Sequence, residues 1–338
     1  MSITLAVDAM GGDHGINVTL PAVARFLHRH PKAKVLLVGQ EAPIQQQLSQ
    51  YHLANHSRVE IIPAQDVITM EDDLATALRR KRNSSMRVAA EQVKHAQAQA
   101  MVSAGNTGAL MAVSRMVLKT LPGIDRPAIC TAIPTKNKHC YMLDLGANVE
   151  ADADHLLQFA LMGNAVAKAV DANPKPRVGL LNIGEEDIKG HETIKQAAKL
   201  MQAHPAIHYT GFVEGNTVFD GVADVVVSDG FVGNVALKTM EGVASMIGHM
   251  LKTEIHASLP RKIAAFLARS IFLGLRQQAD PQRYNGATLV GLNGIVVKSH
   301  GNATVDGFVA AMEVAYQEAQ RDMLTLITAA LQQEEGTP

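Results

Sequence analysis

Five short apolar runs, each followed by a loop with glycine or asparagine and then by a helical pattern, recur along this chain. They begin at Leu5, Met101, Tyr141, Val178 and Val225. Runs of four to eight apolar residues that do not alternate strictly are typical of buried parallel strands, and the helical period after each is typical of a crossover helix. In such a sheet the strand-to-helix loops share the carboxyl edge, so the sequence predicts that these loops converge on one crevice.

The other apolar runs predict a mixed sheet rather than a purely parallel one. Runs at 128–134 and 139–144 are so close that we expect a hairpin around 135–138. A long helix is predicted over 148–169, and the PKPR segment marks a break after it. The remaining strands are predicted at 4–8, 34–38, 59–63 and 100–103 and near Val178, His208, Val225 and Ile295.

Composition is typical of a globular protein of enzyme size. The 338 residues are 47% hydrophobic, enough to bury a large core as one α/β domain or as two lobes. A formal net charge of -1 provides no global field for nucleic acid, so no nucleic-acid partner is expected, and an acidic partner needs a local basic patch. Cys130 and Cys140 cannot form a disulfide framework, and no CxxC or HExxH motif accompanies the 14 histidines. We expect a reducing compartment and no metal site.

Neither a signal peptide nor a membrane-spanning segment is expected. The chain enters a strand within a few residues, without a charged leader and an apolar core. The longest uncharged stretch, 96–114, is interrupted by polar side chains and by the loop at 105–108. These features favour a cytoplasmic protein.

The first strand-to-helix loop combines glycines with carboxylates. Gly11 and Gly12 permit a close backbone approach or a positive φ. Asp8 and Asp13 are acceptors, which repel phosphate unless they bind it through a proton or a metal. The four residues are therefore candidates for phosphate binding, with a tight turn capped by aspartate as the alternative.

The other loops carry neutral polar side chains just ahead of helical patterns. A helix N-terminus attracts anions through its free N–H groups and macrodipole, whereas a simple cap needs only one polar side chain. Several loops of one polar type favour a phosphate-like ligand over capping alone. The candidates in these loops are Ser103, Gly105, Asn106, Thr107, Asp144, Gly146, Asn148, Gly184, Asp229 and Gly230.

Two lysines stand where an anionic ligand would explain them. Lys189 is predicted at a helix start, where a cation costs about 0.3–1 kcal/mol unless the acidic residues 185–187 neutralise it or a ligand shares it. Lys298 ends a predicted strand, and His300 would lie on the same face if the strand continued. Lys298 and His300 could also be ordinary solvated residues at a strand end. Asn234 is a candidate oxyanion donor or only a helix cap.

Two basic segments are candidates for partner contact. The first is usually a solvated helix face, but it can also dock an acidic protein; it contains Arg79, Arg80, Lys81 and Arg82. The second is an amphipathic helix predicted over 258–280, whose pattern fits a membrane surface or, equally, a core or dimer interface. Its stripe and flanking cations are Ile263, Phe266, Leu267, Ile271, Arg261 and Lys262.

Taken together, these motifs resemble one family. The segments run in order from Leu5 to Gly301 and are similar to the PlsX family of bacterial phosphate acyltransferases: LAVDAMGGD, VSAGNTGALM, LDLGAN, GLLNIGEEDIKG, DGFVGNVALKTMEG and VVKSHG. The resemblance implies a homodimer with a three-layer α/β/α fold, similar to phosphotransacetylases and to isocitrate and isopropylmalate dehydrogenases. We accordingly expect one large domain over 1–332, with 258–280 as a helical excursion and 333–338 as a frayed polar tail.

The resemblance also implies a reaction. The family transfers an acyl group from an acyl carrier protein thioester to inorganic phosphate, without a cofactor, and a membrane acyltransferase could use the acyl phosphate. By resemblance, Lys189 and Lys298 stabilise charge, Asn234 donates to the oxyanion and His300 carries a proton. The expected product favours reversible association with an anionic membrane surface.

Two other functions stay open. One is a phosphotransacetylase that uses coenzyme A, and the other is a non-catalytic scaffold at the membrane. A dehydrogenase is disfavoured because the chain has no GxGxxG fingerprint.

Overall fold

The computed structural model describes residues 2–272, 274 and 285–335. The strands are β1 (Thr4–Asp8), β2 (Lys34–Gly39), β3 (Val59–Pro63), β4 (Ala100–Ser103), β5 (Ala128–Pro134), β6 (His139–Leu143), β7 (Arg177–Leu181), β8 (His208–Val213), β9 (Val225–Val227), β10 (Ala287–Val290) and β11 (Ile295–Lys298). The helices are α1 (Ile16–Arg29), α2 (Glu41–Leu48), α3 (Ser85–Lys94), α4 (Thr107–Leu118), α5 (Ala153–Asp171), α6 (Glu192–Ala203), α7 (Gly230–His256), α8 (Leu259–Leu267), α10 (Val305–Gln320) and α11 (Met323–Glu335), with short turns η1 (Ser49–Tyr51), η2 (Thr76–Arg80) and η3 (Val218–Asp220).

The strands form one 11-stranded sheet whose two halves run in opposite directions. Its order is β3-β2-β1-β4-β11-β10-β5-β6-β9-β7-β8. The strands from β3 to β11 are parallel to one another, and so are those from β6 to β8. Three antiparallel pairings, β11 with β10, β10 with β5 and β5 with β6, separate the two halves. Because three reversals invert the direction, the carboxyl ends of β6, β7 and β9 lie at the opposite edge from those of β1 and β4. The prediction that all five loops share one carboxyl edge is therefore wrong.

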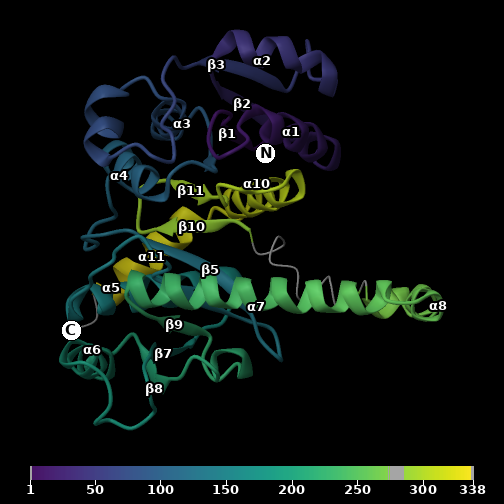
Figure 1. Cartoon of the computed structure of the whole chain (residues 1–338). Coiled ribbons are helices and arrows are strands. Elements are labelled where there is room, and N and C mark those ends of the chain that lie inside the picture. The colour runs from purple at the N-terminus through teal and green to yellow at the C-terminus, as the bar shows by residue number, and fades with distance from the viewer. Residues whose placement is uncertain (1, 273, 275–284, 336–338) are drawn as a thin grey trace.

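Helices cover both faces of the sheet, so the predicted three-layer α/β/α fold is confirmed (Figure 1). The pleat sends Leu5 and Val7 of β1 to one face and Ala6 to the other. The first face packs against α1, α5, α6, α10 and α11, and the second against α3, α4 and the first turns of α7. Among the described helices, none combines the length and the apolar character needed to cross a membrane.

Most predicted elements are present, and the hairpin of β5 and β6 is confirmed by antiparallel pairing that sets Pro134 opposite His139. The long helix predicted from 148 instead begins at Ala153, after the cap Asp152, because the loop before it is held by side-chain bonds described below. The antiparallel strand β10 was not predicted, since its four residues lead into another strand and not into a helix.

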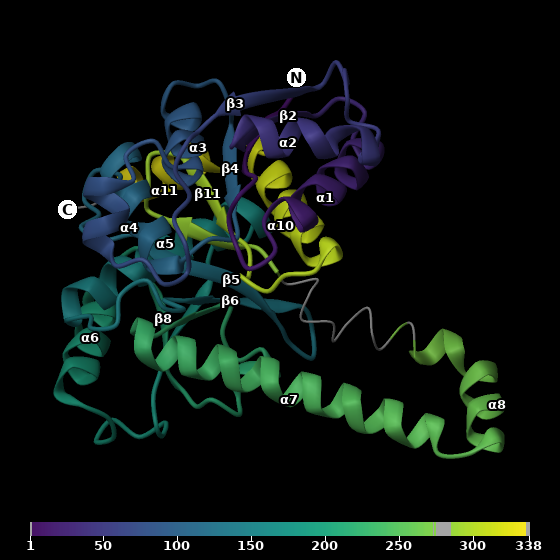
Figure 2. The same cartoon turned by 45° about the horizontal axis from the view of Figure 1, so that its top comes forward.

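The predicted ends of the chain segments also differ in part. The polar residues 333–335 continue α11, which ends at Glu335. Residues 336–338, and residues 273 and 275–280 of the predicted helical excursion, lie outside the described residues. The described part of the excursion contains α8 and residues 268–272 and 274, with Ile271 exposed, and α7 carries α8 away from the sheet (Figure 2).

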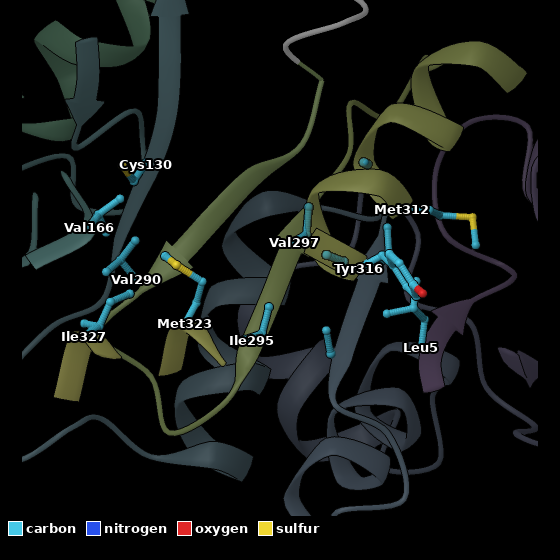
Figure 3. Close-up of a cluster of buried hydrophobic side chains, with 14 of the residues drawn as sticks. Leu5, Cys130, Val166, Val290, Ile295, Val297, Met312, Tyr316, Met323 and Ile327 are labelled. Atoms are coloured by element: carbon cyan, nitrogen blue, oxygen red, sulfur yellow. The ribbon is translucent and has the colours of Figure 1, made fainter. Parts of the chain in front are cut away.

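A cavity of about 220 Å³ lies in the first core, between β10 and β5 on one side and α5, α10 and α11 on the other. Glu318 of α10 lines it, and the Thr288 hydroxyl donates to Glu318 Oε1 at 2.5 Å. Burial raises the pKa of Glu318 to about 7, because this one hydrogen bond only partly offsets the loss of water. Figure 3 shows part of the apolar lining, which includes Cys130, Val166, Val290, Met323 and Ile327.

Glu318 should make the stability of the fold depend on pH. Its pKa is higher in the folded than in the unfolded chain, so folding takes up a proton between about pH 4.5 and 7, and stability falls as pH rises through that window. We expect Glu318→Gln to remove part of this fall. Thermal unfolding at pH 5 and pH 8 measures it, with Glu60→Gln on the exposed surface of β3 as control. If Tm falls equally between pH 5 and pH 8 for the two variants, Glu318 is not the group responsible for the pH dependence.

Candidate functional site

A first cluster lies where β1 and β4 end. Asp8 is buried and accepts a hydrogen bond from the Ser103 hydroxyl at 2.6 Å, while Ser103 Oγ accepts from the Gly105 N–H at 3.1 Å. Burial raises the pKa of Asp8 in spite of its hydrogen bonds. A Cβ atom added at Gly11 would lie 2.6 Å from Asp8 Oδ2, so only glycine fits there. These residues fix the loops to each other.

The loop after β11 joins the same cluster. The Asp13 N–H donates to the Gly301 carbonyl at 2.8 Å, and a Cβ atom at Gly12, where φ is +85°, would lie 2.8 Å from that oxygen. Lys298 is 9% exposed, and its ammonium donates to the Ser299 carbonyl. Burial, aided by Lys238 and opposed by Asp13, lowers the pKa of Lys298 to about 8.

Asn106 differs from its predicted role. Its Oδ1 accepts from the Ala109 N–H at 3.0 Å and its Nδ2 donates to the Met70 carbonyl at 2.8 Å. Both ends of the amide are thus used to cap and anchor α4. The groups that remain available to bind an anion at this helix N-terminus are the Thr107 hydroxyl and the free N–H groups of the first turn.

His300 is held by a residue that the sequence reasoning did not single out. Strand β11 ends at Lys298, so His300 lies in the following loop, where its Nε2 is 3.1 Å from Glu241 Oε1. Burial opposes ionisation of Glu241, but its contacts with His300 and Lys238 outweigh it and lower its pKa to about 2. An ionised Glu241 therefore orients the imidazole from α7.

A second cluster lies at the opposite edge, after β6. Asp144 accepts from the N–H groups of Ile129, Ala147 and Asn148 at 2.6–3.0 Å, and also from the Asn148 side chain. Asn148 Nδ2 donates in addition to the Pro127 carbonyl at 2.9 Å. Burial raises the pKa of Asp144 against these bonds. Asp144 and the Asn148 amide thus hydrogen-bond within the loop, which does not fit the prediction that they bind phosphate directly.

The start of α7 is docked onto this loop. Asp229 caps the helix by accepting from the Val232 N–H at 2.9 Å, and the Gly230 N–H donates to the Asn148 carbonyl at 2.8 Å. This close approach leaves Asn234 beside Gly146, where an added Cβ would lie 3.3 Å from Asn234 Cγ. The side chain of Asn234 is exposed and has no hydrogen bond within the described part of the chain, so its amide is free to donate.

Lys189 lies in the loop after β7, at the same edge as the second cluster. Helix α6 begins at Glu192 after the cap His191, so the prediction that Lys189 starts a helix is wrong. Its backbone is held by Asn182, whose Nδ2 donates to both the Gly184 and Lys189 carbonyls. The ammonium is exposed and forms no ion pair with any described residue, so the neighbouring carboxylates do not neutralise it.

Helix α7 brings the two edges of the sheet together. Asn234, Lys238 and Glu241 follow one another at i, i+4 and i+7, so they share one helix face. Asn234 contacts the second cluster and Glu241 contacts the first, about 10 Å apart along the helix at 1.5 Å per residue. The spacing of Asn234, Lys238 and Glu241 in the sequence indicates this shared face, but Lys238 and Glu241 were not predicted as site residues.

An open pocket of about 400 Å³ adjoins the second cluster, between α4 and the loop after β6. It is lined by Met111, Arg115, Arg126, Pro127, Ala147, Asn148, Val149 and Glu150. The two arginines were not predicted as site residues. Over the residues that the structure describes, no cluster of three or more His, Cys, Asp or Glu side chains is arranged to hold a metal ion.

The basic segment around η2 is only partly available to a partner. Lys81 contacts Asp72 and donates to the Val67 carbonyl at 2.7 Å, so its ammonium is not free for the predicted docking patch. Contact with Lys81 lowers the pKa of Asp72. Arg79, Arg80 and Arg82 remain exposed.

Comparison with known proteins places these features in context. The family profile described as "Fatty acid synthesis protein" matches residues 3–326. A phosphate acyltransferase from Alcanivorax borkumensis is 61% identical over 331 residues, covering 98% of each chain, and one from Paraburkholderia xenovorans is 48% identical over 337 residues, covering 100% of this chain and 91% of its own.

Solved structures share the fold at low sequence identity. The EutD phosphotransacetylase from Staphylococcus aureus matches with a TM-score of 0.60 and 17% identity over 94% of both chains. A branched-chain phosphotransacylase from Enterococcus faecalis matches with a TM-score of 0.60 and 13% identity, over 94% of this chain and 99% of its own. The expected similarity to the phosphotransacetylase fold is confirmed.

Lys298 should make anion binding depend on pH. Its pKa of about 8 means that the ammonium is charged below pH 8 and loses its proton above it. We expect the affinity for sulfate, an anion whose own charge does not change in this range, to fall between pH 7.5 and 9.5, and Lys298→Met to bind weakly with little pH dependence. Titration calorimetry measures both. A pH-independent affinity in the unsubstituted protein would remove Lys298 from the anion site.

Proposed function

Because the chain belongs to the PlsX family of phosphate acyltransferases, we propose that it transfers a fatty acyl group from an acyl carrier protein thioester to inorganic phosphate. The product, an acyl phosphate, would feed phospholipid synthesis. One observation supports the proposal most: a single face of α7 carries Asn234, whose amide has no partner among the described residues, and Glu241, which contacts His300 close to Lys298.

In the proposed reaction, a phosphate oxygen attacks the thioester carbonyl and the C–S bond breaks as the acyl–oxygen bond forms. Lys298, Thr107 and the α4 N-terminus would hold the phosphate, since they are cationic or donor groups in the first cluster. Asn234, one helical turn from Lys238, would donate to the oxyanion, and Lys189 would add positive charge. These interactions gain strength as negative charge develops on the carbonyl oxygen, so they favour the transition state over the substrate.

The leaving thiolate needs little help. A thiol has a pKa near 8.5, so it departs readily, and no covalent acyl-enzyme is required. His300, oriented by the ionised Glu241, is the proposed donor of the proton that the thiolate takes up. Among the described residues, neither buried cysteine is a suitable nucleophile, because burial raises the pKa of Cys140 to about 12 and that of Cys130 further.

The donor assay decides between the candidate functions. Purified protein is incubated with radiolabelled phosphate and either acyl carrier protein or coenzyme A thioester of the same chain length, and acyl phosphate is trapped with hydroxylamine. We expect product from the carrier thioester. Product from coenzyme A alone would favour a phosphotransacetylase, the function named for the solved structures of this fold. No product from either donor would favour the non-catalytic scaffold.

An acidic carrier protein could dock at Arg79, Arg80 and Arg82, which are exposed on and beside η2. This segment is linked to the first cluster, since α4 contacts η2 and Asn106 at the start of α4 holds the Met70 carbonyl. Cations at this position would steer an acidic partner towards the thioester site.

Lys189→Ala should lower acyl transfer more than tenfold, a loss of about 1.4 kcal/mol in transition-state stabilisation. Its ammonium has no partner within the described chain, so Tm should stay near that of the unsubstituted protein. Initial rates and thermal unfolding test both points, with Lys199→Ala on the exposed face of α6 as control. Activity within about threefold would make Lys189 an ordinary surface residue.

The exposed apolar residues of α7 and α8 form two separate stripes, for which we propose two occupants. Val243, Met246, Ile247 and Met250 recur at i, i+3, i+4 and i+7 on α7, a spacing that suits packing against the same helix of a second copy. On α8, Ile263, Phe266 and Leu267 are 55%, 68% and 76% exposed. Arg261 contacts Glu254 at 2.5 Å, whereas Lys262 has no partner among described residues and could face anionic lipid.

A peripheral enzyme on the inner membrane surface would release its acyl phosphate where a membrane acyltransferase can use it. Burial of apolar surface contributes about 25 cal/mol per Å², so one short helix binds weakly. A homodimer that presents two copies of α8 would bind better through effective concentration.

Phe266→Asp with Leu267→Asp should abolish sedimentation with anionic vesicles and leave soluble acyl transfer and the dimer intact, because both side chains are exposed and far along α8 from the site. The matched control is Met246→Asp with Met250→Asp, which should weaken the dimer through the α7 stripe. Vesicle sedimentation and light scattering measure the two effects. If the α8 variant becomes monomeric, the stripe is a dimer surface and the membrane proposal fails.

A further inference from the structure

The pocket between α4 and the loop after β6 contains two arginines whose charges are not neutralised. The exposed side chain of Arg115 makes no hydrogen bond or ion pair with any described residue, and the half-buried side chain of Arg126 only donates to the Glu150 carbonyl at 3.4 Å. By contrast, Arg177 binds both oxygens of Asp224, and Arg87 contacts Glu91 at 3.0 Å. Two like charges lining one pocket repel each other unless an anion lies between them.

Nearby carboxylates do not provide that anion. Asp125 precedes Arg126 in the chain, but it accepts from Gln158 Nε2 at 2.8 Å and its own N–H donates to the same side chain. Glu150 lines the pocket, yet its carboxylate forms no ion pair with either arginine in the described structure. The positive charge of the pocket is thus left for a ligand.

The pocket wall is rigid and leads to the proposed reaction centre. Asn148 is buried, and its main chain and side chain are fixed by Asp144 and Pro127. The Asn148 carbonyl accepts from the first N–H of α7, the helix that presents Asn234 one turn later. A ligand group in this pocket therefore lies beside the acyl-transfer site and not at an unrelated surface.

We propose that Arg115 and Arg126 form a subsite for a phosphate group of the substrates. The guanidinium fork matches phosphate oxygens in pairs, and such charge-assisted bonds are among the strongest available to side chains. Because Lys298 and Thr107 are the proposed site of the inorganic acceptor, the phosphate at Arg115 and Arg126 is assigned to the phosphodiester that joins the pantetheine arm to the carrier protein, and the experiment below also tests inorganic phosphate. This assignment rests on the proposed function, because only acyl transfer from such a donor brings both kinds of phosphate to the site.

The test uses donors that differ only in this phosphate. Initial rates are measured with acyl-phosphopantetheine and with acyl-pantetheine for the unsubstituted protein, Arg115→Gln, Arg126→Gln and the double variant, with Lys94→Gln on the exposed end of α3 as the charge control. Loss of a charge-assisted hydrogen bond of about 1.5–3 kcal/mol predicts a rise in KM of about tenfold or more.

The two sources of phosphate give different results. If the subsite holds the donor, the unsubstituted protein prefers the phosphorylated thioester and the double variant treats both donors alike, with KM for inorganic phosphate unchanged. If it holds the acceptor, KM for inorganic phosphate rises with both donors. If the KM values of the arginine variants lie within twofold of those of Lys94→Gln for both donors and for inorganic phosphate, the proposal is overturned.

Calorimetry with phosphopantetheine and with inorganic phosphate provides a readout that needs no catalysis. We expect binding by the unsubstituted protein of at least one of them and its loss in the double variant. If the protein formed no acyl phosphate yet bound in this way, the proposed function would fail and the subsite would stand. Circular dichroism checks that each variant is folded, and the single variants serve if the double variant is not.

Discussion

The antiparallel pairing of β5 with β6 reverses the second half of the sheet, and the arrangement of the site depends on this reversal. In an all-parallel sheet the loops after every strand would meet at one carboxyl edge. Here the loops after β1, β4 and β11 lie at one edge and those after β6, β7 and β9 at the other. A substrate can engage both only if some element spans the face between them.

Helix α7 spans that face because two glycines let it approach the loop after β6. A Cβ atom at Gly233 would lie 1.9 Å from the Asp144 carbonyl oxygen, and one at Gly230 would lie 2.5 Å from the Asn148 carbonyl oxygen. Any larger residue would push the start of the helix outward and move Asn234, Lys238 and Glu241 with it, since a helix transmits such a shift along its length. Glycine inside a helix costs about 0.5–1 kcal/mol relative to alanine, so close docking offsets a real penalty here.

The local pattern of the chain was sufficient to predict every strand but β10, and with them the β5–β6 hairpin and a mixed α/β sheet, because apolar runs and their periods report burial directly. The three-layer arrangement came from the family resemblance. It could not predict which polar groups remain available. Asn106, Asp144 and Asn148 are the right residue types for an anion site, yet their hydrogen bonds are satisfied within the fold. Lys189 and Arg115 are the opposite case, since only the structure shows that neither side chain forms an ion pair with a described carboxylate. Hydrogen-bond partners come from distant segments, which sequence spacing does not encode.

Cations without an ion pair among the described residues lie at both edges of the sheet, although the overall charge of the chain is close to zero. The formal net charge is -1, so most cations are balanced somewhere, and pairs such as Arg25 with Asp306 show how. Lys298 is the extreme member, because burial beside Lys238 already lowers its pKa to about 8. Burial of this ammonium is unfavourable, and Lys238 adds repulsion that its ion pair with Glu241 at 2.8 Å only partly offsets. A phosphate dianion would relieve both effects as it binds. The repulsion that binding removes adds to the affinity for the anion. A site that recognises an anion by charge therefore needs few neutral hydrogen-bond donors.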